Sequence, residues 1–277
     1  MHNLRSIWWM TRMNLFKWSR DLRILLILVL VGTLTHMHIS GLISFVHNEH
    51  FTIHFALLPF WTESSYVKIL FFLPIFILFA DAPFIDNLQL FLIMRSNRRN
   101  WVSSQILYVM ITSMSYVVCV AVFFGVFFIP HLEWGSDWGN VVNTLSKSNM
   151  GSQLGVLINF PRKIIDYFSP YQALFFSFIL QSLVINLMGL IILLMNIWSS
   201  QRYLGLFIAA SFLMLDVLIR SSGVLTWVSP VSWIRLTMIN INGELSHPNF
   251  YQIIFMLILL TIGLVYLIVK RIRRYEV

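Results

Sequence analysis

The chain has 277 residues, of which 58% are hydrophobic and only 11% are charged, about half the charged fraction of a typical soluble protein. Its formal net charge is +8, and its single cysteine rules out an intrachain disulfide. This composition excludes a soluble globular or disordered chain and predicts an integral membrane protein with several spans.

Residues 1–20 precede the first long apolar stretch and predict a helix that lies in the membrane interface. An apolar stripe at helical spacing consists of Leu4, Ile7, Trp8, Leu15 and Trp18, with Arg5 and Arg12 beside it. Indole rings favour the level of the lipid headgroups, and arginines can reach the phosphates. The alternative is a plain basic anchor in front of the first span.

Six apolar stretches follow, and each predicts a transmembrane helix. They are 24–45, 66–80, 102–129, 172–197, 203–219 and 251–269. Most reach the ~20 residues that cross the hydrocarbon as a helix, whereas the second and fifth are short and are expected to extend into their flanks. The predicted fold class is an all-α integral membrane protein with six transmembrane helices, an N-terminal interfacial helix and short re-entrant outer helices.

The positions of lysine and arginine predict the orientation. Most of them lie before the first stretch, between the second and third, between the fourth and fifth, and after the sixth. They are Arg5, Arg12, Lys17, Arg20, Arg23, Arg95, Arg98, Arg99, Arg202, Lys270, Arg271, Arg273 and Arg274. Short basic connections stay in the cytoplasm, so both termini are predicted to be cytoplasmic. The positive charge then meets anionic lipid headgroups, and no nucleic-acid partner is predicted.

The connections between the stretches are too short to form a separate soluble domain, so 1–277 is predicted to be a single transmembrane domain. Three connections are predicted to be extracellular: 47–65, 131–170 and 221–250. The third contains Trp227, Pro230 and Trp233. Such apolar content predicts short helices that dip back toward the membrane and pack on protein.

The cytoplasmic connection 81–101 carries the most specific pattern in the chain. It begins with acidic residues and a proline, continues with leucines and ends with arginines, as a short helix would. The residues expected to contact a cytosolic partner are Asp86, Leu88, Leu92, Arg95, Arg98 and Arg99. The alternative is an ordinary basic turn that only enforces topology.

Polar residues inside the spans form a second group of candidates. Asp216 lies in the fifth stretch, with Arg220 four residues later. A carboxylate in a span is costly, so this pair is a candidate for the transport pathway or its gating. A structural ion pair within one helix is the alternative. Gln181, Asn186 and Asn196 are expected to bridge helices by hydrogen bonds.

Three histidines after the first stretch, His47, His50 and His54, have a spacing that could hold Zn²⁺ or Cu²⁺ or sense pH. Their aromatic surroundings favour an interfacial loop instead, so no metal site is predicted. The HExxH, GxSxG and phosphate-loop motifs do not occur in the sequence. The chain is therefore predicted to have no catalytic residues and not to be an enzyme.

The combination of an interfacial arm, six spans and an acidic-to-basic inner loop resembles the permease subunits of type-2 ABC exporters. In that family this loop carries the coupling helix, which sits in a groove of the ATPase subunit. The stretch from Asp86 through Arg98 to Gln105 is similar to the family's loose pattern, although Asn87 and Leu88 stand where glycine is frequent. The segment 229–233 is similar to the family's re-entrant connection.

The resemblance implies an exporter in a bacterial cytoplasmic membrane. The apolar, aromatic-rich sequence favours an amphipathic, lipid-like or peptide substrate over a small ion. The resemblance also implies two ABC ATPase subunits that bind ATP and Mg, a second permease chain (identical or related) and contacts with membrane lipids. It implies no cofactor in this chain. The alternatives from other classes are a membrane-embedded enzyme and a peptide sensor or immunity protein, both using the outer histidines and Asp216.

Overall fold

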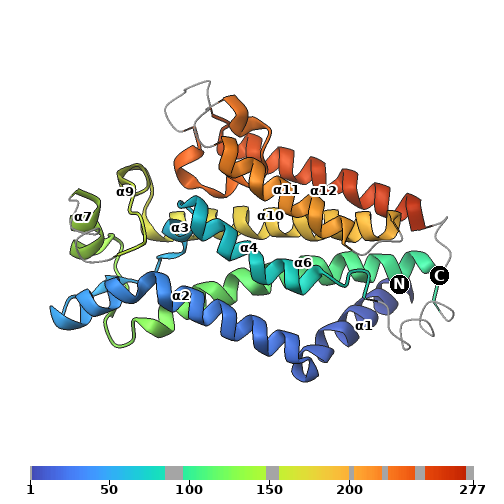
Figure 1. Cartoon of the computed structure of the whole chain (residues 1–277), viewed down its shortest axis with the longest axis horizontal. Helices are drawn as coiled ribbons and strands as arrows, with labels where there is room; N and C mark the ends of the chain where they lie inside the picture. The colour runs from blue at the N-terminus through green and yellow to red at the C-terminus, as the bar shows by residue number, and fades with distance from the viewer. Residues whose placement is uncertain are drawn as a thin grey trace.

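The computed structural model describes residues 2–84, 96–147, 156–199, 203–219, 224–240 and 247–272, which are mostly helical (Figure 1). The elements in chain order are α1 (His2–Phe16), η1 (Lys17–Arg20), α2 (Leu22–Asn48), β1 (Ile53–His54), α3 (Leu58–Trp61), α4 (Ser65–Phe79), α6 (Arg98–Phe127), β2 (Leu132–Glu133), α7 (Gly139–Lys147), α9 (Arg162–Tyr167), α10 (Pro170–Trp198), α11 (Leu204–Ile219), η2 (Val224–Trp227), η3 (Ser232–Ile234), η4 (Leu236–Met238) and α12 (Phe250–Ile272). Here η denotes a short 3-10 helix.

Four of these helices, α2, α6, α10 and α12, are long and apolar enough to cross a membrane. Two shorter apolar helices, α4 and α11, have 15 and 16 residues. Each of the six apolar stretches in the sequence coincides with one of these helices. A 15-residue helix rises only about 22 Å, less than the ~30 Å of hydrocarbon. The four-residue helix α3 precedes α4 and is separated from it by residues 62–64.

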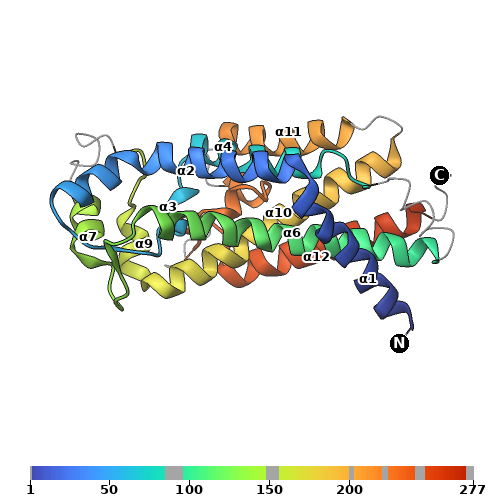
Figure 2. The same cartoon turned by 90° about the horizontal axis from the view of Figure 1, so that it is seen from below.

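Helix α10 is the central element of the bundle. Its most apolar 18-residue window is 72% buried, compared with 17% for α12. It packs against α4, α6, α11 and α12, which surround it (Figures 1 and 2). The remaining faces of the outer helices expose apolar side chains, as helices in contact with lipid do.

The bundle has two distinct ends (Figure 1). The start of α1, the end of α4, the start of α6 and the end of α12 lie at one, which we call the terminal end. The β strands, α7, α9 and the 3-10 helices lie at the other, which we call the cap end. The described residues that flank the predicted inner connections lie at the terminal end, and the described parts of the predicted outer connections lie at the cap end.

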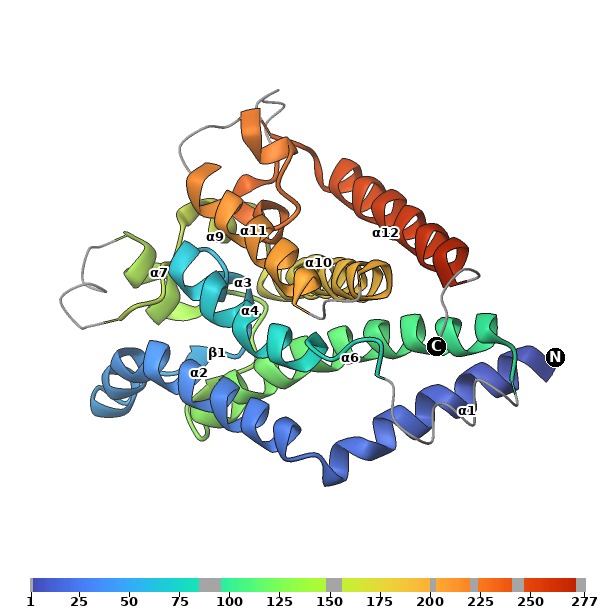
Figure 3. The same ribbon diagram turned by 45° about the vertical axis from the view of Figure 1, so that its right-hand side comes forward.

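Helix α1 lies alongside α6 (Figure 3). Its buried face includes Met10 and Thr11, and the Thr11 hydroxyl donates to the carbonyl oxygen of Ser104 at 3.2 Å. Leu4 and Trp8 of the predicted apolar stripe are 75% and 54% exposed. These two side chains therefore point away from the bundle, where a membrane interface would cover them. Trp18 of the same stripe instead contacts Tyr108 of α6.

The cap end contains a feature that the all-α prediction missed. Strands β1 and β2 form a parallel pair in which Ile53 is opposite Leu132 and His54 is opposite Glu133. The amide of Ile53 also donates to the carbonyl oxygen of His131 at 2.9 Å. Two-residue strands leave no periodicity in a sequence, because alternation needs at least four residues to be visible.

The packing of α10 predicts a strong effect at Gly189. A Cβ atom there would lie 2.6 Å from Val109 Cγ1 and 2.9 Å from Phe79 Cε2. We expect Gly189→Ala to lower the free energy of unfolding by about 1–3 kcal/mol, because these helices must move apart. Thermal unfolding of the protein in detergent micelles, followed by circular dichroism, measures the change.

Gly263→Ala in α12 is the matched control, because a Cβ at Gly263 meets nothing within 4 Å. Alanine favours the helix by about 1 kcal/mol over glycine, so this variant should unfold at the same temperature or higher. Equal unfolding temperatures of the two variants would contradict the close packing at Gly189.

Candidate functional site

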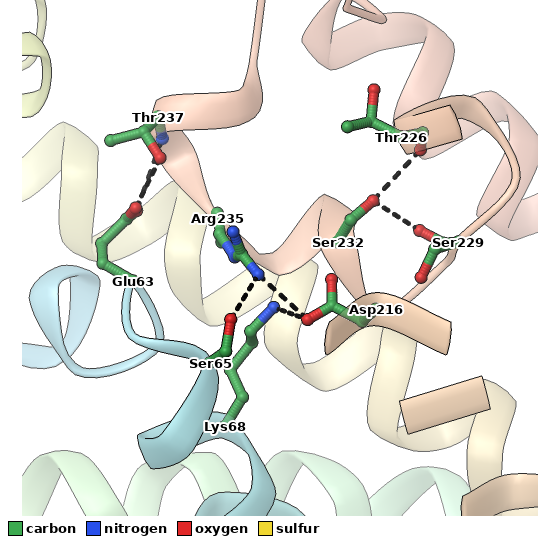
Figure 4. Close-up of polar contacts among 9 residues, drawn as sticks. All are labelled: Glu63, Ser65, Lys68, Asp216, Thr226, Ser229, Ser232, Arg235 and Thr237. Carbon is green, nitrogen blue, oxygen red and sulfur yellow. Dashed lines mark hydrogen bonds and ion pairs between the residues drawn. The ribbon is translucent and has the colours of Figure 1, made fainter. Parts of the chain in front are cut away.

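The candidate site is a buried ion cluster at the cap end, and its first member is Lys68. This lysine lies in the apolar helix α4 and its side chain is 0% exposed. Its ammonium group forms an ion pair with the carboxylate of Asp216 in α11 (Figure 4). An unpaired charge in this position would lose its hydration without compensation. Each group therefore requires the other, and the pair fixes α4 against α11.

Arg235, between η3 and η4, adds a second cation to the same carboxylate. Its Nη2 atom lies 3.0 Å from Asp216 Oδ2 and 3.1 Å from the hydroxyl oxygen of Ser65 (Figure 4). The side chains of Arg235 and Asp216 are 5% and 2% exposed. Two cations thus share one carboxylate, and these three residues together carry one net positive charge.

Glu63, in the turn between α3 and α4, supplies a second carboxyl group beside the cluster. The hydroxyl of Thr237 donates to one of its oxygens, and the Thr237 amide donates to the other at 3.4 Å. Burial raises the pKa of the Glu63 carboxyl, and the Thr237 hydrogen bonds with the charges of Arg235 and Lys68 act in the opposite direction. When Glu63 is ionised, the four charged groups sum to zero.

The segment that carries Arg235 is compact. The hydroxyl of Ser232 donates to the carbonyl oxygens of Ser229 at 2.7 Å and Thr226 at 3.1 Å, and the indole of Trp233 donates to Thr226 at 2.8 Å. These bonds satisfy backbone groups that would otherwise be buried without partners. Residues 224–240 are therefore held together by their own hydrogen bonds.

A third attachment reaches this segment from α9. The ammonium group of Lys163 donates to the carbonyl oxygens of Thr237 at 2.7 Å and Ile239 at 3.0 Å. Segment 224–240 is thus attached by polar side chains to α4, α11 and α9. Such an arrangement can transmit movement between these elements, because a shift of any one of them breaks a polar contact with segment 224–240.

The cluster only partly matches the sequence prediction. Asp216 is buried in a polar cluster as a functional candidate would be, but Arg220 lies outside the described residues. The observed partners of Asp216 are Lys68 and Arg235, which the sequence analysis did not connect with it. A lysine and an aspartate in two different apolar helices were the signal that could have found the pair, since buried charges rarely occur singly.

The predicted coupling residues are only partly described. Asp86, Leu88, Leu92 and Arg95 lie outside the described residues. Arg98 and Arg99 form the first turn of α6, at the terminal end.

Two of the polar residues in α10 bridge helices, as predicted. The amide of Gln181 donates to the hydroxyl of Thr62 at 3.3 Å near the cap end. Asn196 donates to the carbonyl oxygen of Ala82 at 2.6 Å and accepts from the amide of Gly205 at 3.3 Å. Asn196 therefore connects α10 with the end of α4 and the start of α11.

The three candidate histidines do not come together. His47 lies 3.3 Å from His131, between ring nitrogens, and His54 is buried under the cap. His50 has a positive φ of 53° just beyond the end of α2. Among the residues that the structure describes, no three or more histidine, cysteine, aspartate or glutamate side chains are grouped to hold a metal ion.

His54 instead has a structural position with a defined tautomer. The amide of Ala56 donates to its Nδ1 at 3.1 Å, so Nε2 carries the hydrogen and donates to the carbonyl oxygen of Gly135 at 3.0 Å. Burial lowers the pKa of the His54 imidazole, although Gly135 and the charge of Glu133 oppose the shift. Protonation at Nδ1 would remove the acceptor for Ala56.

This arrangement predicts a pH dependence of stability. Because folding lowers the pKa of His54, the unfolded chain binds more protons as the pH falls below about 6.5. The free energy of unfolding should therefore fall between pH 7 and pH 5, and His54→Gln should remove that part of the loss. Thermal midpoints in detergent across this range test it. His47→Gln, at an exposed histidine, should retain the loss, and an unchanged slope in His54→Gln would contradict the prediction.

The ion cluster predicts a large effect for Asp216→Asn. Loss of the carboxylate leaves Lys68 and Arg235 facing each other in a buried site, which should cost about 3–5 kcal/mol of the free energy of unfolding. Thermal unfolding in micelles measures the change. Asp166→Asn, at an exposed carboxylate of α9, should stay within about 0.5 kcal/mol.

A double variant separates charge imbalance from loss of packing. Adding Lys68→Met to Asp216→Asn removes one of the two uncompensated cations, so the double variant should be more stable than Asp216→Asn alone. If the two losses simply add, the residues do not interact as the structure describes.

No family model matches the chain, and neither the curated proteins nor the solved structures give a match to it.

Proposed function

We propose that this chain is the transmembrane subunit of an ATP-driven exporter of the type-2 ABC class. Helices α2, α4, α6, α10, α11 and α12 are its six spans, and the terminal end faces the cytoplasm of a bacterial cell. Two copies of a separate ATPase subunit, with ATP and Mg, supply the energy. A second permease chain, identical or related, completes a path for an amphipathic, lipid-like or peptide substrate.

The observation that carries the proposal is how the inner connection is anchored. At its start, Asp81 forms an ion pair with Arg23 in the first turn of α2. At Phe84, the last described residue before the gap at 85–95, the ring packs edge-on against Tyr108 of α6 with centroids 4.8 Å apart. A partner that pushes on the connection therefore acts directly on two of the proposed spans.

On its other side, the connection runs into α6 and contacts α1. The Ser96 hydroxyl lies 3.6 Å from the sulfur of Met10 in α1, and the indole of Trp18 donates to the Tyr108 hydroxyl at 2.9 Å. Helix α6 has 30 residues and is therefore about 45 Å long, more than the ~30 Å of hydrocarbon. Its excess length at the terminal end, with α1 alongside, gives a rigid arm on which an ATPase can act.

At the opposite end, the ion cluster gives the proposed exporter its external closure. Lys68, Asp216 and Arg235 join α4, α11 and segment 224–240 through groups whose separation in a low-dielectric site costs several kcal/mol. These elements then move together rather than separately. In the proposed cycle, ATP-driven displacement at the terminal end opens the path by moving this joined unit.

The first test is the identity of the partner. The tagged chain, purified in mild detergent from its native host, should retain an ATPase with a phosphate-binding loop. The second test reverses the charges of Arg98 and Arg99 to glutamate. Because like charges at an interface cost several kcal/mol, retention of the ATPase should fall by at least about tenfold, which corresponds to 1.4 kcal/mol.

Lys270→Glu in α12 is the matched control, since it also reverses a cation at the terminal end but lies outside the connection 81–101. It should retain the ATPase. If the Arg98 and Arg99 reversals leave both retention and ATP-dependent substrate movement unchanged, the coupling role is wrong. Peptide binding by the chain without ATP-dependent movement would favour the sensor class instead.

A further inference from the structure

An apolar groove opens on the side of the bundle between α6 and α10, near the cap end. Its cavity volume is about 580 Å³. One wall includes Val122, Gly125 and Val126 of α6, and the other includes Leu174 and Phe175 of α10. A volume of this size falls in the range of ~300–1,000 Å³ that holds small ligands.

The strand β2 divides this groove from a second, polar cleft. Leu132 and Trp134 line the groove, whereas Glu133 and Gly135 line the cleft, which has a volume of about 880 Å³. Successive residues of an extended segment point to opposite sides, so one short stretch has an apolar side and a polar side. This boundary places the top of the groove at the level where hydrocarbon gives way to water.

The aromatic residues at the top of the groove also indicate that this part of the chain lies at the boundary between hydrocarbon and water. Trp134 stacks on Phe55 with ring centroids 4.4 Å apart, and Tyr171 lies 5.7 Å from Phe55. Trp134 is 68% exposed and Tyr171 is 46% exposed. Amphipathic rings of this kind are enriched at the level of lipid headgroups.

Exposure of the apolar groove walls to water would be energetically unfavourable. Val122, Val126 and Phe175 are 56%, 53% and 59% exposed and form part of one continuous apolar surface. Helices α6 and α10 are both long and apolar enough to cross a membrane, and in a membrane this surface would face hydrocarbon. In hydrocarbon there is no hydrophobic driving force, so the affinity of this concave surface for a ligand depends on van der Waals contact.

We propose that this groove is a binding site for one acyl chain of a phospholipid in the leaflet at the cap end. The chain lies between α6 and α10, and the headgroup lies beside Trp134 and Tyr171. Gly125 gives the groove its depth, because a Cβ there would meet nothing within 4 Å. The proposal requires residence in a membrane and is independent of the ATPase partner.

Gly125→Leu tests the site, because its Cβ has free space around it and the longer side chain occupies the groove. The matched control is Gly263→Leu, at a glycine of α12 whose added Cβ also meets nothing within 4 Å. Each protein is reconstituted in vesicles with a phosphatidylcholine that carries a diazirine midway along one chain. Labelled peptides are then identified by mass spectrometry, with circular dichroism to verify helical content.

We expect wild-type protein to be labelled preferentially at 118–134 and 171–178, more than on the exposed face of α12. Gly125→Leu should lower labelling of these two segments by about tenfold, equivalent to 1.4 kcal/mol, while Gly263→Leu leaves it unchanged. Two results would overturn the proposal. One is labelling of 118–134 and 171–178 that is no stronger than labelling of equally exposed residues elsewhere. The other is labelling of these segments that Gly125→Leu does not lower.

A second measurement uses the wild-type side chains. Bromine atoms midway along the acyl chains should quench part of the tryptophan fluorescence, and Trp134→Phe should remove that part. A second copy of the chain is the competing occupant. If Gly125→Cys forms a disulfide-linked dimer in vesicles and Trp134 is shielded from brominated lipid, the groove is a protein interface and the lipid proposal is wrong.

Discussion

The structure depends first on the need of buried charges for one another. Helices surrounded by lipid gain little hydrophobic free energy from packing together, because lipid tails are as apolar as leucine. Polar contacts therefore decide which apolar helices become neighbours and in what register. Lys68, Asp216 and Arg235 perform this function at the cap end, where they join α4, α11 and segment 224–240. Loss of Asp216 leaves Lys68 and Arg235 without the carboxylate that they share.

The same principle operates along α10, with small residues and amides in place of charges. Asn196 supplies the hydrogen bonds at the terminal end, and Gly205 allows the approach, since a Cβ there would lie 2.6 Å from the amide oxygen of Asn196. Gly189 allows a similarly close approach in the middle of the helix. Helix α10 is thus positioned by short-range contacts, whereas the outer helices keep long apolar faces for the membrane.

The sequence predicts the helices well, since the length and the hydrophobicity of an apolar run together indicate a helix that can span a membrane. All six stretches fall on helices of the structure within a few residues. The ion cluster was not predictable in the same way, because Asp216 is 148 residues from Lys68 and 19 from Arg235. A spacing rule within one helix pointed to Arg220 instead. The packing face of α1 was also missed, because it is formed by less apolar residues such as Thr11 and depends on contact with α6.

The short pair of strands has a mechanical consequence. It joins the chain just after α2 to the chain just after α6, so these two helices are tied at the cap end through residues about 80 positions apart. At the terminal end, the contacts of Arg23 with Asp81 and of Phe84 with Tyr108 tie them again. Contacts at both ends oppose lengthwise sliding of one helix along the other. Helices α2 and α6 are therefore expected to tilt together rather than to shift past each other.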